Sequence, residues 1–177
     1  GIKVMVTNAP TPETLVFLKS GKIDFGVVST PFSGEGVHSE TVREIEDIFV
    51  AGRQFFQYKN KTLDLHDLEN LPLITLEKNT STRSCMDSFL AENGVRINPE
   101  FELATSDMIV QFALRSLGIG NVVRDFAAEY LESGRLFELR FNKMIPRRHF
   151  CVVTGKGNLL SAAARRLLEL IQTEEYR

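Results

Sequence analysis

Short apolar runs alternate along this chain with segments whose apolar residues recur at helical spacing. The apolar runs predict strands at Ile2–Val6, Ile23–Thr30, Leu71–Leu76, Phe101–Ala104, Ile119–Val123, Arg135–Phe141 and His149–Thr154. The helical spacing predicts helices at Thr11–Ser20, Thr82–Asn93, Asp107–Leu117, Phe126–Ser133 and Leu159–Gln172. This alternation is typical of an α/β fold in which helices cover parallel sheets.

The first helix has clear start and stop signals. Thr11 is the expected N-cap, Pro12 occupies the first helical position, and Glu13 adds a first-turn carboxylate, while Gly21 ends the helix. The strands on either side of this helix are expected to be parallel and joined by a right-handed crossover. The second of them, Ile23–Thr30, is apolar enough to be buried on both faces.

Length and charge narrow the classes of function. The 177 residues allow one domain or two small ones, and 43% of them are hydrophobic, as in an ordinary globular chain. With 21 basic and 23 acidic residues, the chain lacks the charge of a nucleic-acid-binding surface, so another segment would have to contact DNA. No apolar run predicts a membrane span or a signal peptide, so we expect no membrane partner and a cytoplasmic location.

Residues that commonly carry catalysis or hold metals are few and scattered. Cys85 and Cys151 form no CxxC motif, and we expect both to be buried thiols. His38, His66 and His149 lack metal-ligand spacing. Because no acid–base pair stands out either, we expect no cofactor, no metal and no enzymatic activity.

Hydroxyl-bearing residues cluster where predicted strands end and helices begin. Ligands of open α/β sheets bind beyond the carboxyl ends of the strands, where helix N-termini offer free N–H groups. The candidate effector-binding residues are therefore Thr11, Ser29, Thr30, Thr80, Ser81, Thr82, Arg83, Thr105 and Ser106. A single Ser or Thr at such a position can equally be a helix cap. Arg83 can instead pair with Asp87, four residues along the helix.

Four motifs follow one another in an order that resembles a known family. They are Leu18–Gly26 (LKSGKIDFG), Leu65–Thr75 (LHDLENLPLIT), Thr80–Arg83 (TSTR) and Ala113–Gly120 (ALRSLGIG). This set is similar to the effector-binding domain of LysR-type transcriptional regulators. Where that family usually carries an apolar residue, Asn121 interrupts an apolar strand, so its side chain either faces the cleft or bonds a neighbouring backbone group.

The resemblance implies a fold like that of the type 2 periplasmic binding proteins, with two Rossmann-like α/β lobes joined by two crossing strands. A small polar or anionic effector would bind in the cleft between the lobes. Breaks in the alternation near 49–53 and 141–148 place the first lobe at residues 1–50 and 143–177 and the second at 51–142. The resemblance also implies a homodimer or homotetramer.

In this family an N-terminal helix-turn-helix domain contacts DNA. We expect that domain, and the first strand and helix of the effector-binding domain, to be missing before Ile2. Two alternatives stay open. A free-standing solute-binding protein shares the fold but would carry a signal peptide in its parent gene, and an enzyme such as a small dehydratase needs acid–base groups in the cleft.

Overall fold

Two compact units make up the protein, whose computed structural model describes residues 3–157 and 160–172. The first unit takes in residues 1–44 and 148–177, and the second takes in residues 45–147. The chain therefore passes into the second unit after residue 44 and returns after residue 147. The lobe boundaries expected from the sequence, after residues 50 and 142, stay a prediction.

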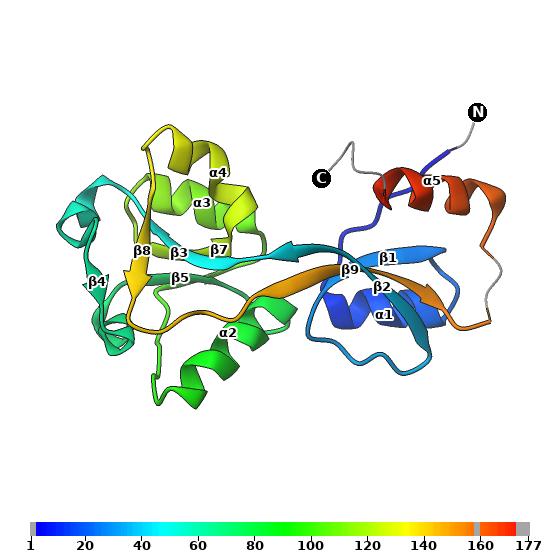
Figure 1. The fold of residues 1–177 in the computed structure, drawn as a ribbon, viewed down its shortest axis with the longest axis horizontal. Coiled ribbons are helices and arrows are strands. Elements are labelled where there is room, and N and C mark those ends of the chain that lie inside the picture. Colours follow the sequence, from blue (N-terminus) through cyan, green and yellow to red (C-terminus); the bar gives the residue numbers. More distant parts are fainter. Residues whose placement is uncertain (1–2, 158–159, 173–177) are drawn as a thin grey trace. The chain divides into compact units, whose positions relative to one another are not determined.

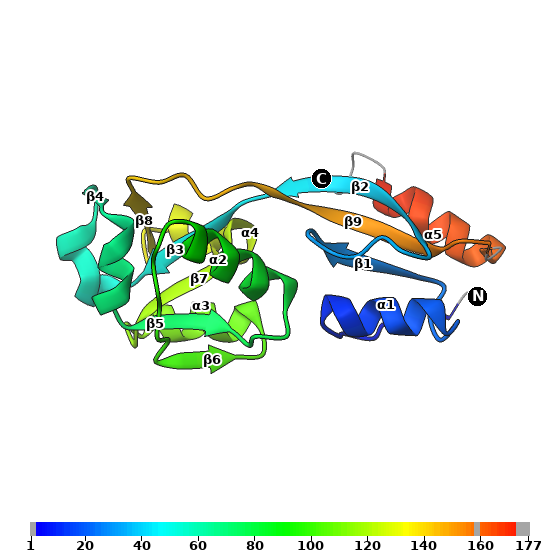
Figure 2. The same cartoon turned by 90° about the horizontal axis from the view of Figure 1, so that it is seen from below.

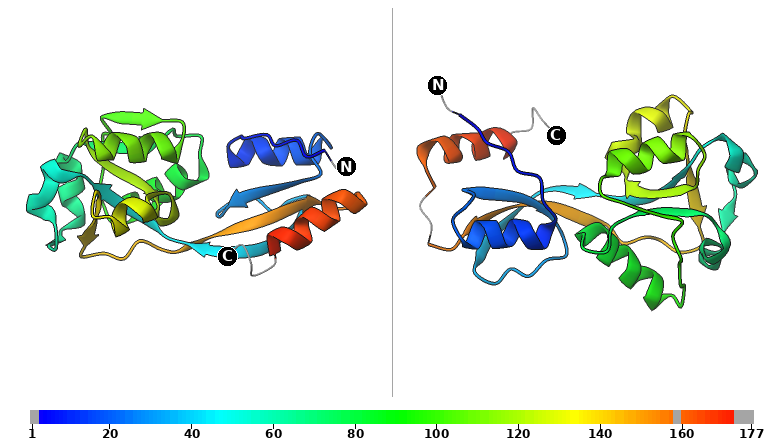
Figure 3. Two further views of the ribbon diagram at one scale, coloured as in Figure 1. Left: turned by 90° about the horizontal axis from the view of Figure 1, so that it is seen from above. Right: turned by 180° about the vertical axis from the view of Figure 1, so that it is seen from behind.

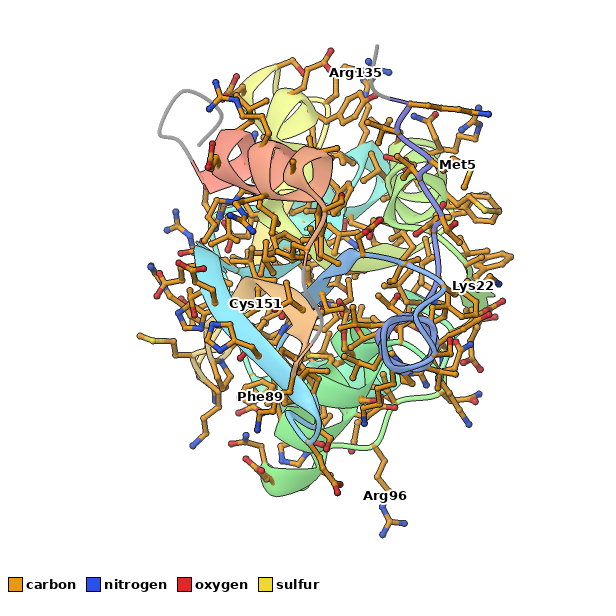
Figure 4. All side chains as sticks on the ribbon, turned by 90° about the vertical axis from the view of Figure 1, so that its right-hand side faces the viewer. Met5, Lys22, Phe89, Arg96, Arg135 and Cys151 are labelled. Atoms are coloured by element: carbon orange, nitrogen blue, oxygen red, sulfur yellow. The ribbon has the colours of Figure 1, made fainter. Side chains whose placement is uncertain are left out.

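The first unit is a three-stranded sheet with a helix on each face. Its strand order is β1 (Phe25–Ser29), β9 (Arg148–Gly155) and β2 (Val37–Ile45). Helix α1 (Thr11–Lys19) packs Leu15 and Leu18 against Val28 and Val153. Helix α5 (Ala162–Gln172) lies on the opposite face of the sheet, as Figures 2 and 3 show from below and above. Cys151 lies on β9 beside β2 (Figure 4), and its thiol approaches the Thr41 hydroxyl.

Three predictions about the start of the chain are wrong. No strand forms at residues 3–10, so β1 has no parallel partner before the helix; Ile2 lies outside the described residues. Strand β1 instead pairs antiparallel with β9, from Phe25 opposite Thr154 to Ser29 opposite Phe150. It is not buried on both faces, because Val27 is half exposed. The apolar pattern at residues 3–6 is not sufficient for a strand, because a strand also needs a hydrogen-bonded partner.

The start of α1 also differs from the prediction. Pro10 is the N-cap and Thr11 is the first helical residue, with no side-chain cap bond. The Thr14 hydroxyl instead donates to the carbonyl oxygens of Pro10 and Ala9, at 3.1 and 3.2 Å. Proline has no side-chain acceptor, so the helix begins without a side-chain cap, and Thr11 lies one position too far along the chain to be its N-cap.

The second unit contains a mixed six-stranded sheet (Figure 1). The strand order is β4 (Thr62–Leu63), β8 (Phe137–Phe141), β3 (Asp47–Ala51), β7 (Ile119–Val123), β5 (Leu73–Leu76) and β6 (Phe101–Leu103). Strands β7, β5 and β6 are parallel, and β3 is antiparallel to both of its neighbours. Short 3-10 helices span Arg53–Tyr58 and Leu65–Asn70.

Helices cover both faces of this sheet and form two separate cores. Helix α2 (Ser81–Glu92) packs on the face that carries Phe49 and Leu73. Helices α3 (Ser106–Leu114) and α4 (Arg124–Glu132) pack on the other face, which carries Ile48 and Ile74. Adjacent strand residues thus point to opposite cores, which explains why β3, β5 and β7 are buried along their whole length.

Most predicted elements of the second unit are confirmed within a few residues, and β7 is confirmed at both ends. Strand β3 was missed, because the break seen near Phe49–Arg53 begins inside a fully buried strand and not at a polar connection. The Asn121 side chain donates to the Ile48 carbonyl oxygen at 3.2 Å, which confirms that it satisfies neighbouring backbone. In the first unit, β9 and α5 are confirmed, although Leu159 lies outside the described residues.

Replacing Gly120 with alanine should destabilise the second unit. A Cβ added there would lie 2.6 Å from the Ile109 Cγ2 atom, so α3 would have to move away from the sheet. We expect a loss of about 1–3 kcal/mol in the free energy of unfolding, measured by urea denaturation. Gly34→Ala is the control, because a Cβ on Gly34 meets nothing within 4 Å. Equal stability of the two variants would contradict the packing of α3 on β7.

Candidate functional site

The carboxyl ends of β5 and β6 form the edge of the sheet where a ligand is expected. The two strands are parallel, with Leu76 opposite Leu103, so both end at the same edge. The backbone N–H of Glu77 donates to the Leu103 carbonyl oxygen at 3.1 Å and joins the two strand ends. Helix α2 leaves β5 on one face and α3 leaves β6 on the other, which is the arrangement that opens a binding crevice in α/β sheets.

The start of α2 presents three consecutive hydroxyl groups. Thr80 is the N-cap, and its Oγ1 accepts from the Arg83 backbone N–H at 3.2 Å and donates to the Glu77 carbonyl oxygen at 2.9 Å. Both bonds serve the helix start. Ser81 is half-buried and Thr82 is 8% exposed, so neither is an ordinary surface hydroxyl.

The start of α3 lies at the same edge and repeats this arrangement in simpler form. Thr105 is the N-cap, and its hydroxyl accepts from the Met108 backbone N–H at 3.4 Å. Ser106 is the first helical residue and is half-buried. The structure thus brings Thr80, Ser81, Thr82, Thr105 and Ser106 to one edge of one sheet, beside two helix N-termini. Their contact with an effector stays a prediction.

Arg83 is buried and already bonded on several sides. Its Nε donates to Asp87 Oδ1 at 2.8 Å, which confirms the alternative pairing considered from the sequence. Its Nη1 lies 2.8 Å from Thr75 Oγ1, 2.8 Å from Glu102 Oε2 and 3.0 Å from the Leu76 carbonyl oxygen. The side chain is only 4% exposed, so its partners are the protein's own groups.

The remaining candidates, Thr11, Ser29 and Thr30, belong to the first unit. Helix α1 leads through a short turn into β1, so the start of α1 and the end of β1 lie at the same end of that layer. Ser29 is buried, whereas Thr11 and Thr30 are half-buried. The Thr30 hydroxyl accepts from the His149 backbone N–H at 2.9 Å. The Thr30 carbonyl oxygen accepts from the Arg148 guanidinium at 2.8 Å.

Sequence reasoning missed a charged cluster in the second unit. Arg124 donates to Glu46 at 2.6 Å and to Glu138 at 2.8 Å, and Arg147 donates to Glu46 at 2.6 Å. These four residues line part of a cavity of about 560 Å³. The sequence does not predict this cluster, because Glu46 and Arg124 are 78 residues apart and meet only through the pairing of β3 with β7.

Electrostatics favour the charged forms of Glu46 and Arg124. The hydrogen bond from Arg124 lowers the pKa of Glu46; burial opposes this, and the charges of Arg124 and Arg147 add to the lowering. Burial also lowers the pKa of Arg124, but the bonds to Glu138 and Glu46 outweigh it, so the net pKa is raised. None of the candidate effector residues lines this cavity, or a second one of about 200 Å³ in the first unit between α5 and the sheet.

Other kinds of site find no support in the described residues. Within residues 3–157 and 160–172, no three His, Cys, Asp or Glu side chains gather closely enough to hold a metal ion. Both cysteines are free thiols, Cys151 buried and Cys85 partly so. No helix in this part of the chain has both the length and the apolar composition needed to cross a membrane.

Comparison with known proteins identifies relatives along nearly the whole chain. The LysR substrate binding domain family model matches residues 1–175. The transcriptional activator CmpR of Synechocystis is 26% identical over 97% of this chain and 56% of its own length. A RuBisCO operon transcriptional regulator of Allochromatium vinosum is 25% identical over 100% of this chain and 58% of its own. The chain spans little more than half the length of these relatives.

Solved structures share the fold at lower sequence identity. The regulatory domain of CcmR from Synechocystis, in complex with 2-PG, matches with a TM-score of 0.81 and 16% identity, over 92% of this chain and 78% of that one. The effector-binding domain of QuiR, in complex with shikimate, matches with a TM-score of 0.79 and 16% identity, over 93% and 77%. The fold is therefore the periplasmic-binding-protein-like α/β fold of these effector-binding domains. With the family model covering residues 1–175, the chain belongs to the LysR substrate binding domain family.

Proposed function

We propose that this chain is the effector-sensing domain of a LysR-type transcriptional regulator and that it binds a small polar or anionic metabolite. The observation that carries the proposal is the pair of hydroxyl-bearing helix starts, of α2 and α3, at one edge of the β5–β6 pair. Helix N-termini offer backbone N–H groups and a positive end, and the adjacent hydroxyls add donors and acceptors. CmpR and the RuBisCO operon regulator, two of the relatives that match, are transcriptional regulators, which favours sensing over catalysis.

The effector would act by stabilising one arrangement of the protein over another. A ligand shifts such an equilibrium only as far as its affinities for the two arrangements differ. Contact with DNA would belong to another segment, since the net charge of this chain is −2. A homodimer or homotetramer would carry the change from the effector to the DNA, and this assembly is part of the proposal.

A thermal-shift screen tests whether the chain binds such ligands. The ligands bound to two similar domains, 2-PG and shikimate, are the first probes, with inorganic phosphate as a plain anion. A concentration-dependent rise in melting temperature is expected for at least one of them, because a ligand that binds only the folded state stabilises it. The absence of any shift in a folded sample, across these and a wider panel of small carboxylates and amino acids, would count against the proposal.

Replacing Thr82 with valine should weaken binding of whichever probe gives a shift. Valine keeps the shape of threonine but removes the hydroxyl, so a lost hydrogen bond should cost about 1–3 kcal/mol of binding free energy. Isothermal titration calorimetry measures the change. Ser84→Ala is the matched control, because Ser84 is exposed and lies two residues further along the same helix. Unchanged binding by the Thr82 variant would remove the start of α2 from the site.

A further inference from the structure

Arg83 collects acceptors from three different elements of the second unit. Thr75 and the Leu76 carbonyl belong to β5, Glu102 belongs to β6, and Asp87 lies one turn along α2. A guanidinium group suits this role because its donors are fixed in one plane and point in several directions. An arginine that merely capped its own helix would need none of the contacts to β5 and β6.

The register of β5 and β6 places two of these acceptors side by side, so that one guanidinium reaches both. Thr75 lies directly opposite Glu102, and Arg83 Nη1 is 2.8 Å from a side-chain oxygen of each. The next pair is Leu76 and Leu103, after which β5 turns towards α2 and β6 turns towards α3. The guanidinium therefore holds the two strands together just before the turns that carry the hydroxyl groups.

The positive charge of Arg83 is neutralised by two carboxylates of the protein itself. Two carboxylates, Asp87 and Glu102, each lie 2.8 Å from the guanidinium and are about 40% exposed, while Arg83 itself is 4% exposed. An incoming anion would thus meet the partly exposed carboxylates before the buried cation. Charge matching of this kind favours a structural use of Arg83 over direct recognition of an anionic ligand.

We propose that Arg83 is a positioning residue that sets the spacing between the starts of α2 and α3, with Glu102 as its partner on β6. The proposal deepens the proposed function, since it concerns the same site, and it reassigns Arg83 from ligand contact to ligand-site geometry. Recognition is then left to the hydroxyl groups of Thr80–Thr82, Thr105 and Ser106 and to the backbone N–H groups beside them.

Amide hydrogen exchange tests this without any ligand. Arg83→Lys keeps the charge but replaces the planar fork with a point charge that cannot reach both strands and Asp87 together. We expect exchange to rise about tenfold or more in residues 77–84 and also in residues 103–108, with β3 and β8 unchanged. Glu102→Gln, a milder change at a partly exposed position, should raise exchange in 103–108 in the same direction. Arg115→Gln is the control, because Arg115 is exposed and its guanidinium bonds Gln111, four residues back on the same face of its helix end.

Each other outcome overturns the proposal. Faster exchange confined to residues 77–84 would reduce Arg83 to a local support of α2. A uniform increase across the second unit, equal to that of a variant destabilised by a core change such as Leu68→Ala, would show a general loss of stability only. Leu68 suits this comparison because it is buried in the Leu65–Asn70 helix, whereas the Arg83 side chain bonds Thr75, Leu76, Asp87 and Glu102.

A binding measurement separates this proposal from the proposed function. With whichever of 2-PG, shikimate or phosphate binds the parent chain, Arg83→Lys should weaken binding about tenfold and Arg115→Gln should leave it unchanged. If no probe binds the parent chain, the sensing proposal is in question, while the exchange pattern still decides the role of Arg83. If Arg83→Lys binds as well as the parent chain, the positioning role is wrong.

Discussion

Replacing Phe49 with alanine should cost the second unit about 3–5 kcal/mol of its free energy of unfolding. Phe49 is 1% exposed in the middle of β3, opposite Asn121 on one side and Leu139 on the other. Its ring meets that of Phe141 edge to face, with centroids 5.5 Å apart. Removing the ring would leave a cavity between α2 and the sheet and would forfeit an aromatic contact worth about 1 kcal/mol beyond burial.

Urea denaturation followed by circular dichroism gives the size of this loss, and hydrogen exchange assigns it to residues 45–147. The separate readout matters because two compact units need not unfold in one step. Phe126→Ala is the control, since Phe126 is 45% exposed on α4 and should cost well under 1 kcal/mol. A similar small effect at Phe49 would mean that β3 is not a central strand.

Helices and parallel strands of the second unit were predictable because their signals are local. The hydroxyl cap at Thr80, the stop at Gly94 with its φ of +74° and the four apolar or small residues that flank Asn121 in β7 all act within their own segment. Strand β2 escaped prediction because most of its side chains are exposed and polar, and it exists through its place beside β9. The strand predicted at residues 3–6 does not form, although its pattern is apolar, because no neighbouring strand pairs with these residues.

The candidate site was predictable in its residues and not in its connections. Hydroxyl groups at Thr80–Thr82 and Thr105–Ser106 follow from strand-end positions that the sequence pattern already indicates. The bond between Arg83 and Glu102 on β6 does not follow from the sequence pattern. Glu102 is 19 residues from Arg83, and the two meet only because the strand register sets Thr75 opposite Glu102. Asp87 was predictable as a partner of Arg83 because it lies only four residues further along the same helix, where side chains at this spacing are neighbours.

Replacing Arg83 with methionine should destabilise the second unit by about 3 kcal/mol. The loss arises because Thr75 Oγ1 and the Leu76 carbonyl oxygen lose a buried donor, and because Asp87 and Glu102 lose the cation that lies between them. Both carboxylates are about 40% exposed, which places the expected loss at the lower end for a broken buried pair. Arg115→Met, at an exposed arginine without a carboxylate partner among the described residues, should cost less than about 0.5 kcal/mol.

A double-mutant cycle with Glu102→Gln gives the sharper test. In the parent chain, Glu102→Gln removes an attraction to Arg83 and should be destabilising. In the Arg83→Met background the same change removes a repulsion between Glu102 and Asp87, so it should be neutral or stabilising. This change from a destabilising to a neutral or stabilising effect, measured as free energies of unfolding in urea, is expected only if one guanidinium serves both carboxylates. Additive effects of the two substitutions would show that Glu102 and Arg83 contribute independently and that the bond joining α2 to β6 carries no stability.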